Sequence, residues 1–138
     1  MTPADLSIED IRIGDSASFT RTFSEEEVTL FSKLSGDENP LHMEDAYAET
    51  TRFKRRLVHG MLVASACSAL VGMRLPGKRC LYLAQTLSFK KPVYIGDTLT
   101  VRGVVTTKSA STGVVTIAIS IKKGEDEVMS GLATVQII

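Results

Sequence analysis

The chain has 138 residues, enough for one ordinary domain with a buried core. Hydrophobic residues make up 43% and charged residues 23%, with 16 Lys and Arg against 16 Asp and Glu. This balance gives no field that would attract nucleic acid or an anionic membrane surface. No apolar run reaches the roughly 18 residues of a membrane span, and the opening MTPADLSIED does not predict a signal peptide.

The two cysteines, Cys67 and Cys80, have neither the spacing of a metal site nor that of a disulfide framework. Reduced thiols in a cytoplasmic protein are therefore the simpler interpretation. No repeat, low-complexity segment or linker divides the sequence. We expect a single domain over residues 1–138, without a bound metal.

The first predicted elements are a strand and a short helix. Residues 13–23, IGDSASFTRTF, alternate well enough for a strand that is entered by a turn at Gly14. Ser24 and Glu27 then match a capping box, in which a hydroxyl at the N-cap and a Glu three residues later satisfy free N–H groups. Gly36 is well placed to end this helix, because glycine adopts the left-handed cap conformation cheaply.

A second predicted helix begins at Gly60 and reads GMLVASACSALVGMRL, without a charge until Arg74. A helix that is apolar or small on every side is expected to be buried on every side. After Pro76 the chain is rich in β-branched residues, much of it alternating, with turn residues between the runs. These runs predict four strands, at residues 81–95, 97–108, 113–123 and 127–138.

One buried helix followed by four long strands in hairpin order predicts an α+β fold, in which an antiparallel sheet curls around the helix. A single sheet on one helix leaves the edges of the sheet and one flank uncovered, and such edges favour pairing with another chain. The sequence therefore also predicts a homodimer.

One stretch, SGDENPLH, concentrates groups that can do chemistry. Asn39 precedes Pro40, which biases its backbone towards an extended conformation and turns the chain after the helix end. Such a turn can bring Asp37 and His42 to one side, and a carboxylate with an imidazole makes a usable acid/base pair. The alternative is structural, with Asp37 as a turn residue and His42 as a cap of the short helix that follows.

SGDENPLH, with Phe31 before it and Ala46 after it, resembles the signature of the MaoC-like (R)-specific enoyl-CoA hydratases. The similarity extends to VHGMLVAS, the PGK turn, YLAQTLSFKKPVYIGD and the last strand, so it covers nearly the whole chain. The resemblance implies the hot-dog fold, an antiparallel β-sheet wrapped around one long central helix. It also implies hydration of a trans-2-enoyl thioester, of coenzyme A or of an acyl carrier protein, to the (R)-3-hydroxyacyl thioester. No cofactor is implied, because coenzyme A is part of the substrate.

The resemblance also implies a role for each residue of the site. Asp37 would accept a proton from the attacking water, and His42 would hold that water and help to deliver a proton to the α-carbon. The backbone N–H of Gly60, at the start of the central helix, would stabilise the negative charge that develops on the thioester oxygen. Asn39 would fix the loop, and Ser68 matches a polar position that can hydrogen-bond and orient the catalytic aspartate.

The substrate needs an apolar slot for its acyl chain and cations for its phosphates. Val71 and Leu75 on the later turns of the central helix and Val135 on the last strand are candidates for the floor of the slot, and equally ordinary core positions. The basic cluster TRFKRR could contact coenzyme A phosphates or an acidic carrier protein, or could be a solvated loop. Its members are Arg52, Lys54, Arg55 and Arg56, the last where related sequences often carry proline.

Three other interpretations stand beside hydration. Hot-dog proteins include acyl-CoA thioesterases, which hydrolyse the same substrates with a water aimed at the thioester carbon. A non-catalytic acyl-thioester binding protein would have no need of Asp37, His42 and Gly60. A carrier-protein dehydratase would run the same reaction backwards. His59 lacks the partners of a metal-ligand motif, and we interpret it as a structural histidine that fixes the start of the central helix.

Overall fold

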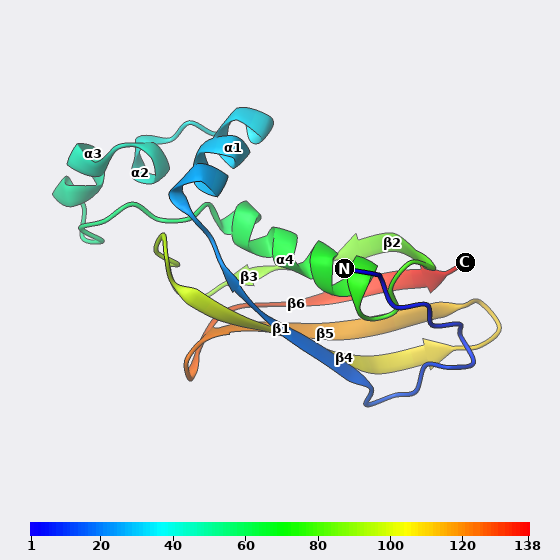
Figure 1. Ribbon diagram of the computed structural model, residues 1–138. Helices are drawn as coiled ribbons and strands as arrows, with labels where there is room; N and C mark the ends of the chain where they lie inside the picture. The colour runs from blue at the N-terminus through cyan, green and yellow to red at the C-terminus, as the bar shows by residue number, and fades with distance from the viewer.

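The computed structural model describes residues 1–138 and shows one sheet, one long helix on it and three further helices beyond the end of that helix (Figure 1). The strands are β1 (Ser16–Thr22), β2 (Cys80–Gln85), β3 (Ser88–Phe89), β4 (Thr98–Ser109), β5 (Val114–Lys123) and β6 (Asp126–Ile137). The helices are α1 (Glu25–Ser35), α2 (Pro40–Met43), α3 (Asp45–Thr50) and α4 (Gly60–Met73). None of them has the length and hydrophobicity needed to cross a lipid bilayer.

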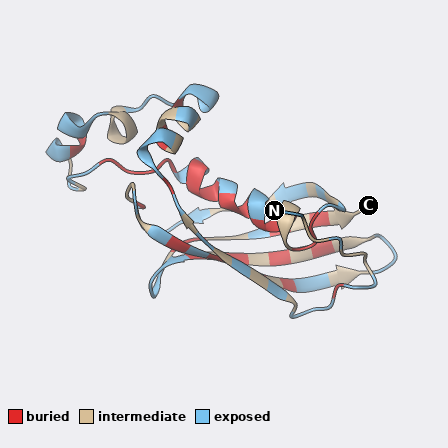
Figure 2. Ribbon diagram, in the orientation of Figure 1, coloured by how far each residue is buried: buried red, intermediate tan, exposed pale blue.

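Neighbouring strands of the sheet are antiparallel, in the order β1-β4-β5-β6-β2, with β3 beside β6. Buried and half-buried residues alternate along most of β5, as expected where one face of a sheet covers a core. α4 lies along that face, and buried residues of the helix and the sheet meet between them (Figure 2). The predicted α+β hot-dog architecture is therefore confirmed.

The contact between α4 and the sheet depends on a glycine in β4. Gly103 is buried, and a Cβ at this position would lie 2.4 Å from Leu70 Cδ2 and 2.9 Å from Ile117 Cγ2. Leu70 and Ile117 are both fully buried, so neither can move aside into solvent. The missing side chain of Gly103 thus makes the room that the leucine of α4 occupies.

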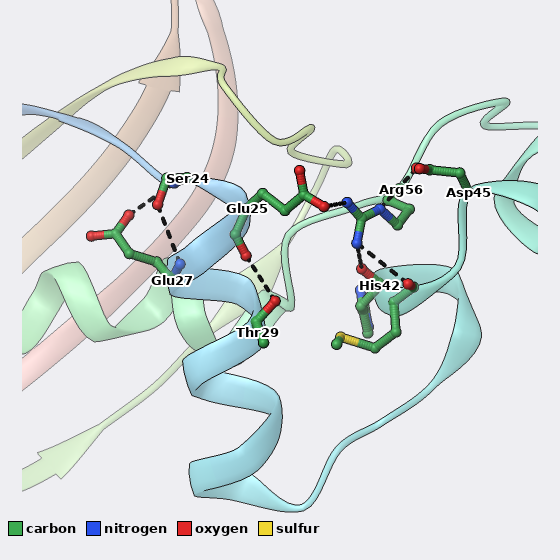
Figure 3. A network of polar contacts seen from close by, with 8 residues as sticks. Ser24, Glu25, Glu27, Thr29, His42, Asp45 and Arg56 are labelled. Atoms are coloured by element: carbon green, nitrogen blue, oxygen red, sulfur yellow. Dashed lines mark hydrogen bonds and ion pairs between the residues drawn. The ribbon is translucent and has the colours of Figure 1, made fainter.

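The predicted boundaries of the first helix are confirmed. Ser24 is the N-cap of α1, where its Oγ accepts a hydrogen bond from Glu27 N at 3.2 Å, and Glu27 Oε2 accepts one from Ser24 N at 2.8 Å (Figure 3). This reciprocal pair is the capping box that the sequence indicates. Gly36 follows the helix with φ +80°, the left-handed conformation that glycine tolerates.

The helices α1, α2 and α3 (residues 25–50) form a helical arm that extends past the N-terminal end of α4 (Figure 1). The chain leaves β1 into the arm and returns through residues 51–59 to the start of α4. The arm therefore stands next to the free N–H groups of the first turn of the central helix.

Two details of the predicted fold are wrong. α4 is buried on one side only, since the sheet covers one face and leaves Met61 59% exposed, with Ser65, Ser68 and Ala69 also exposed. The first of the four predicted strands does not follow hairpin order, because it lies beside β6 as the separate strands β2 and β3. Lys90 N and Lys91 N still donate to Val128 O of β6, whereas Pro92 has no N–H to donate, and from there the chain leaves the sheet until β4 begins.

Replacing Gly103 by alanine is expected to lower the free energy of unfolding by about 1–3 kcal/mol, because the added methyl group must displace buried side chains. Gly72 of α4 is the matched control, since nothing lies within 4 Å of its Cβ position. Alanine at Gly72 should be neutral or stabilising by roughly 0.5–1 kcal/mol. Urea denaturation measures both changes, and equal stabilities of the two variants would contradict the packing role of Gly103.

Candidate active site

Three side chains from different parts of the chain meet where the helical arm joins α4. Asp37 lies in the loop after α1, His42 lies in α2, and His59 is the N-cap residue of α4. One nitrogen of each imidazole and one oxygen of the carboxylate all lie within 4.8 Å of one another. The fold thus brings the predicted pair Asp37 and His42 together, and adds His59 to them.

The loop that carries Asp37 is shaped by its own short-range hydrogen bonds. Ser35 Oγ accepts from Asp37 N at 3.1 Å, and Asp37 Oδ1 accepts from Asn39 N at 3.1 Å. Asn39 is the N-cap of α2, and its Oδ1 accepts from Leu41 N at 2.9 Å, with Pro40 at the first helical position. The Asn39 side chain thereby links the loop to α2, and the Asp37 carboxylate stays exposed to solvent.

His42 is half-buried, and its hydrogen bond defines its tautomer. Nδ1 lies 2.9 Å from Leu57 O, and a carbonyl can only accept, so Nδ1 carries the hydrogen. Burial lowers the pKa of His42 below its ordinary 6.5; His59 acts in the same direction, while Leu57 O and Asp37 oppose it. His42 is therefore uncharged at neutral pH, and its Nε2 has a lone pair that can accept a hydrogen bond from water.

His59 is almost completely buried, with 1% of its surface exposed. Its Nε2 donates to Asp37 O at 3.0 Å, and its ring stacks on that of His42 with 4.0 Å between centroids. Phe31 covers another edge of the ring at 4.9 Å, and Nδ1 has no hydrogen-bond partner. His59 thus ties the Asp37 loop to the start of α4, which is the anchoring role that we expect for it.

The cluster of one carboxylate and two imidazoles is not visible from sequence spacing, because α3 and the following loop separate His42 from His59. Carboxylates and imidazoles are also common ligands of zinc. The two rings are stacked with an inclination of 29°, and each already directs one nitrogen at a backbone carbonyl, which leaves one nitrogen of each ring free. The same carboxylate and imidazoles can transfer protons.

A pocket of about 320 Å³ opens beside His42 and the start of α4. The N–H of Gly60 faces no acceptor within the chain, as expected in the first turn of a helix. Phe89 lies directly against this glycine, since a Cβ there would be 3.1 Å from Phe89 Cε1. The lining residues are His42, Arg52, Phe53, Leu57, Val58, Gly60, Val63, Phe89, Lys90, Lys91, Pro92, Val93, Val128 and Met129.

The apolar walls of this pocket differ from the predicted floor. Val71, Leu75 and Val135 are at most 3% exposed, belong to the core between α4 and the sheet, and do not line the pocket. The walls come instead from residues such as Val63 and Met129. Sequence reasoning missed these positions because nothing in an apolar run distinguishes a pocket wall from a core residue.

Ser68 lies on the exposed face of α4, and no hydrogen bond joins it to Asp37 within the chain. The same exposed face, together with β2, lines a second hollow that includes Met61, Ser65 and Tyr82. The structure therefore places Ser68 on the uncovered flank of the helix and apart from the His42 pocket.

The basic cluster divides into separate environments. Arg52 lines the His42 pocket, and its guanidinium lies 4.8 Å from the ring of Phe53. Lys54 and Arg55 line a different hollow, beside the acidic residues of α3. The phosphate-contact prediction is wrong for Arg56, because its guanidinium is 9% exposed and already bound to carboxylates and carbonyls of the arm.

A model of the MaoC-like domain family matches residues 11–127 of the chain. The (R)-specific enoyl-CoA hydratase of Rhodospirillum rubrum is 45% identical over 129 residues, which cover 94% of this chain and 90% of the relative. The (R)-specific enoyl-CoA hydratase of Aeromonas caviae is 48% identical over 95 residues, which cover 69% of this chain and 71% of the relative.

Solved structures agree with the sequence matches. The (R)-hydratase from A. caviae involved in PHA biosynthesis superimposes with a TM-score of 0.91 at 40% identity, covering 94% of this chain and 99% of that one. R-hydratase PhaJ1 from Pseudomonas aeruginosa, in its unliganded form, gives a TM-score of 0.92 at 36% identity, covering 96% and 86%. With a family match over most of its length and relatives of this similarity, the chain belongs to the MaoC-like domain family.

Proposed function

We propose that the protein catalyses the reversible (R)-specific hydration of trans-2-enoyl-CoA to (R)-3-hydroxyacyl-CoA. One observation carries the proposal: the imidazole of His42 and the N–H end of α4 at Gly60 border one pocket, with the Asp37 carboxylate next to His42. Relatives that carry the name of this activity are 45% and 48% identical to the chain, which supports the same chemistry here.

The reaction needs a base, an oriented water and a donor for developing negative charge. Asp37 takes a proton from water while His42 Nε2 holds that water, and the hydroxyl oxygen bonds to the β-carbon. The electrons of the double bond move towards the thioester oxygen, where the free N–H of Gly60 donates a hydrogen bond. The proton then returns to the α-carbon with the help of His42, so water is consumed and the protein is unchanged. These steps require no further cofactor.

The pocket also supports coenzyme A as the carrier of the acyl group. Val63 and Met129 give the acyl chain apolar walls, and Arg52 is the pocket cation without a carboxylate partner. The other two pocket cations, Lys90 and Lys91, bind Glu127 and Asp126. We therefore assign Arg52 to a phosphate of coenzyme A, in place of the wider basic cluster.

We further propose a homodimer that forms through β2, in the cytoplasm. β1 and β2 are the two edges of the sheet, and the exposed side chains of β1 are Ser and Thr. β2 instead exposes Leu81 and Leu83 by 48% and 50%, and its Tyr82 lines a hollow with the uncovered face of α4. Pairing at β2 would satisfy an open edge and cover this apolar surface. The free thiols of Cys67 and Cys80 fit a reducing compartment.

Mixing the protein with crotonyl-CoA tests the reaction. We expect the ultraviolet absorbance of the conjugated thioester to fall without release of free thiol, because hydration removes the double bond and leaves the thioester intact. Asp37→Asn should lower kcat by at least about 100-fold, since an amide cannot accept the proton. Release of thiol would instead show a thioesterase, and full activity of the variant would remove Asp37 from the mechanism.

The pH dependence of kcat/KM tests the state of His42. Its pKa is lowered by burial, so more than half of the imidazole should remain uncharged at pH 6.5. We therefore expect the acidic limb of kcat/KM for crotonyl-CoA, where His42 gains a proton, to be centred below pH 6.5. An acidic limb centred above 6.5 would contradict an unprotonated Nε2 as the group that holds the water.

Light scattering after gel filtration tests the homodimer. The wild type should elute with twice the chain mass of 15.0 kDa, whereas Leu83→Lys should elute at the monomer mass, because it places a charge on the apolar edge. Thr20→Lys on the polar edge at β1 is the matched control and should remain dimeric. A monomeric wild type, or a change caused only by Thr20→Lys, would refute pairing at β2.

A further inference from the structure

Arg56 is the buried member of an exposed basic segment. Its side chain is 9% exposed, whereas Arg52, Lys54 and Arg55 are exposed to solvent. A buried guanidinium needs partners for its charge and for its N–H groups. Those partners lie on all three helices of the arm (Figure 3).

The guanidinium reaches a different helix with each of its nitrogen atoms. Nε donates to Asp45 Oδ1 of α3 at 2.9 Å, and Nη2 donates to Glu25 Oε1 of α1 at 2.5 Å. Nη1 points at the end of α2, where it donates to His42 O at 3.4 Å and to Met43 O at 3.3 Å. Arg56 is thus the side chain that joins α2 to its two neighbours.

α2 has only four residues, too few to hold a helix together through its own bonds. Pro40 O accepts the one helical bond, from the C-cap residue Glu44 N at 2.9 Å, and Leu41 O is satisfied from outside the helix by Leu57 N at 3.2 Å. The last two carbonyls, His42 O and Met43 O, accept hydrogen bonds from Arg56 Nη1. Without Arg56 the final carbonyls of α2 lose their protein donor.

The next residue in the chain completes the hold on His42. Leu57 O accepts the hydrogen bond from His42 Nδ1, so the ring is bound to residue 57 and the backbone to residue 56. We propose that Arg56 is a positioning residue for His42: by fixing the end of α2 against α1 and α3, it holds the imidazole against Leu57 with Nε2 free. Its effect on rate rests on the proposed function, whereas its effect on the ring does not.

The role requires arginine in particular. A lysine has one nitrogen at the end of its chain, so it cannot reach α1, α2 and α3 at the same time, as the planar fork of Arg56 does. The charges of Glu25 and Asp45 matter less than their oxygens, since these side chains are 69% and 88% exposed and water weakens such ion pairs, whereas the amide oxygen of Gln or Asn still accepts from the guanidinium. Glu25→Gln and Asp45→Asn should therefore change little, and Arg56→Lys should behave like Arg56→Met.

Imidazole NMR tests the positioning without any substrate. The chain has two histidines, so two-bond ¹⁵N–¹H spectra resolve both rings, with His42→Gln for assignment. In the wild type, His42 should show a protonated Nδ1 and His59 a protonated Nε2, as their carbonyl partners require. In Arg56→Lys and Arg56→Met, the His42 shifts should move towards a mixture of tautomers while those of His59 stay unchanged.

Steady-state kinetics separates positioning from phosphate binding. With crotonyl-CoA and with the crotonyl thioester of N-acetylcysteamine, which lacks phosphates, both Arg56 variants should lose about 10- to 100-fold in kcat. The ratio of the two KM values should stay as in the wild type. Arg21→Met is the matched control, because it removes an arginine bound to Glu27 of α1 that does not touch α2, and it should keep the wild-type kcat.

Two results would overturn the proposal. One is a His42 tautomer unchanged in both Arg56 variants, and the other is a rise in KM confined to crotonyl-CoA, which would return Arg56 to phosphate binding. If Arg56→Met does not fold, Arg56→Lys alone carries both measurements. A wild type without hydratase activity would refute the proposed function only, because the NMR shifts still decide whether Arg56 positions the ring.

Discussion

The site depends on two hydrogen bonds from imidazole N–H groups to backbone carbonyls. His59 donates to Asp37 O at 3.0 Å, and His42 donates to Leu57 O at 2.9 Å. The first bond runs from the start of α4 into the helical arm, and the second runs from the arm to the segment just before α4. Because a carbonyl only accepts, the same bonds that place the arm also set the tautomer of each ring.

Polar contacts carry this junction because the arm has little core of its own. α1 buries Val28 and Ser32, α3 buries Ala48, and α2 buries no residue completely. Hydrophobic burial therefore does little to fix the position of α2, and hydrogen bonds to Arg56 and Leu57 fix it instead. By contrast, α4 and the sheet meet through a continuous apolar core with Gly103 under Leu70. The apolar core thus holds the start of α4 in place, and the hydrogen-bonded arm brings Asp37 and His42 next to it.

The surfaces of the domain follow the same division. The sheet covers one face of α4, so the opposite face and the edge at β2 stay open. The pocket, in contrast, lies where arm, helix and sheet meet, with His42, Gly60 and Met129 from the three parts. A change that shifts any one of these parts alters the pocket without touching the chemistry of the groups themselves.

The sequence by itself determined the features that depend on near neighbours. The capping box of Ser24 and Glu27, the stop at Gly36 and the turn at Asn39 all use bonds between residues at most four apart, so a short motif specifies them. The resemblance of SGDENPLH likewise indicated Asp37, because the motif retains its local spacing. The α+β class followed from one apolar helix and a run of alternating strands.

Only the tertiary structure decided which groups are buried and what they bind. Within TRFKRR, Arg56 resembles a solvated cation. In the fold it is buried and bonded to Glu25 and Asp45, which lie 31 and 11 residues away in the chain, so the segment alone does not reveal them. His59 meets Asp37 across 22 residues, and the uncovered side of α4 depends on where the sheet ends. Composition records how polar a residue is, whereas its partners are set by chain segments that only folding brings together.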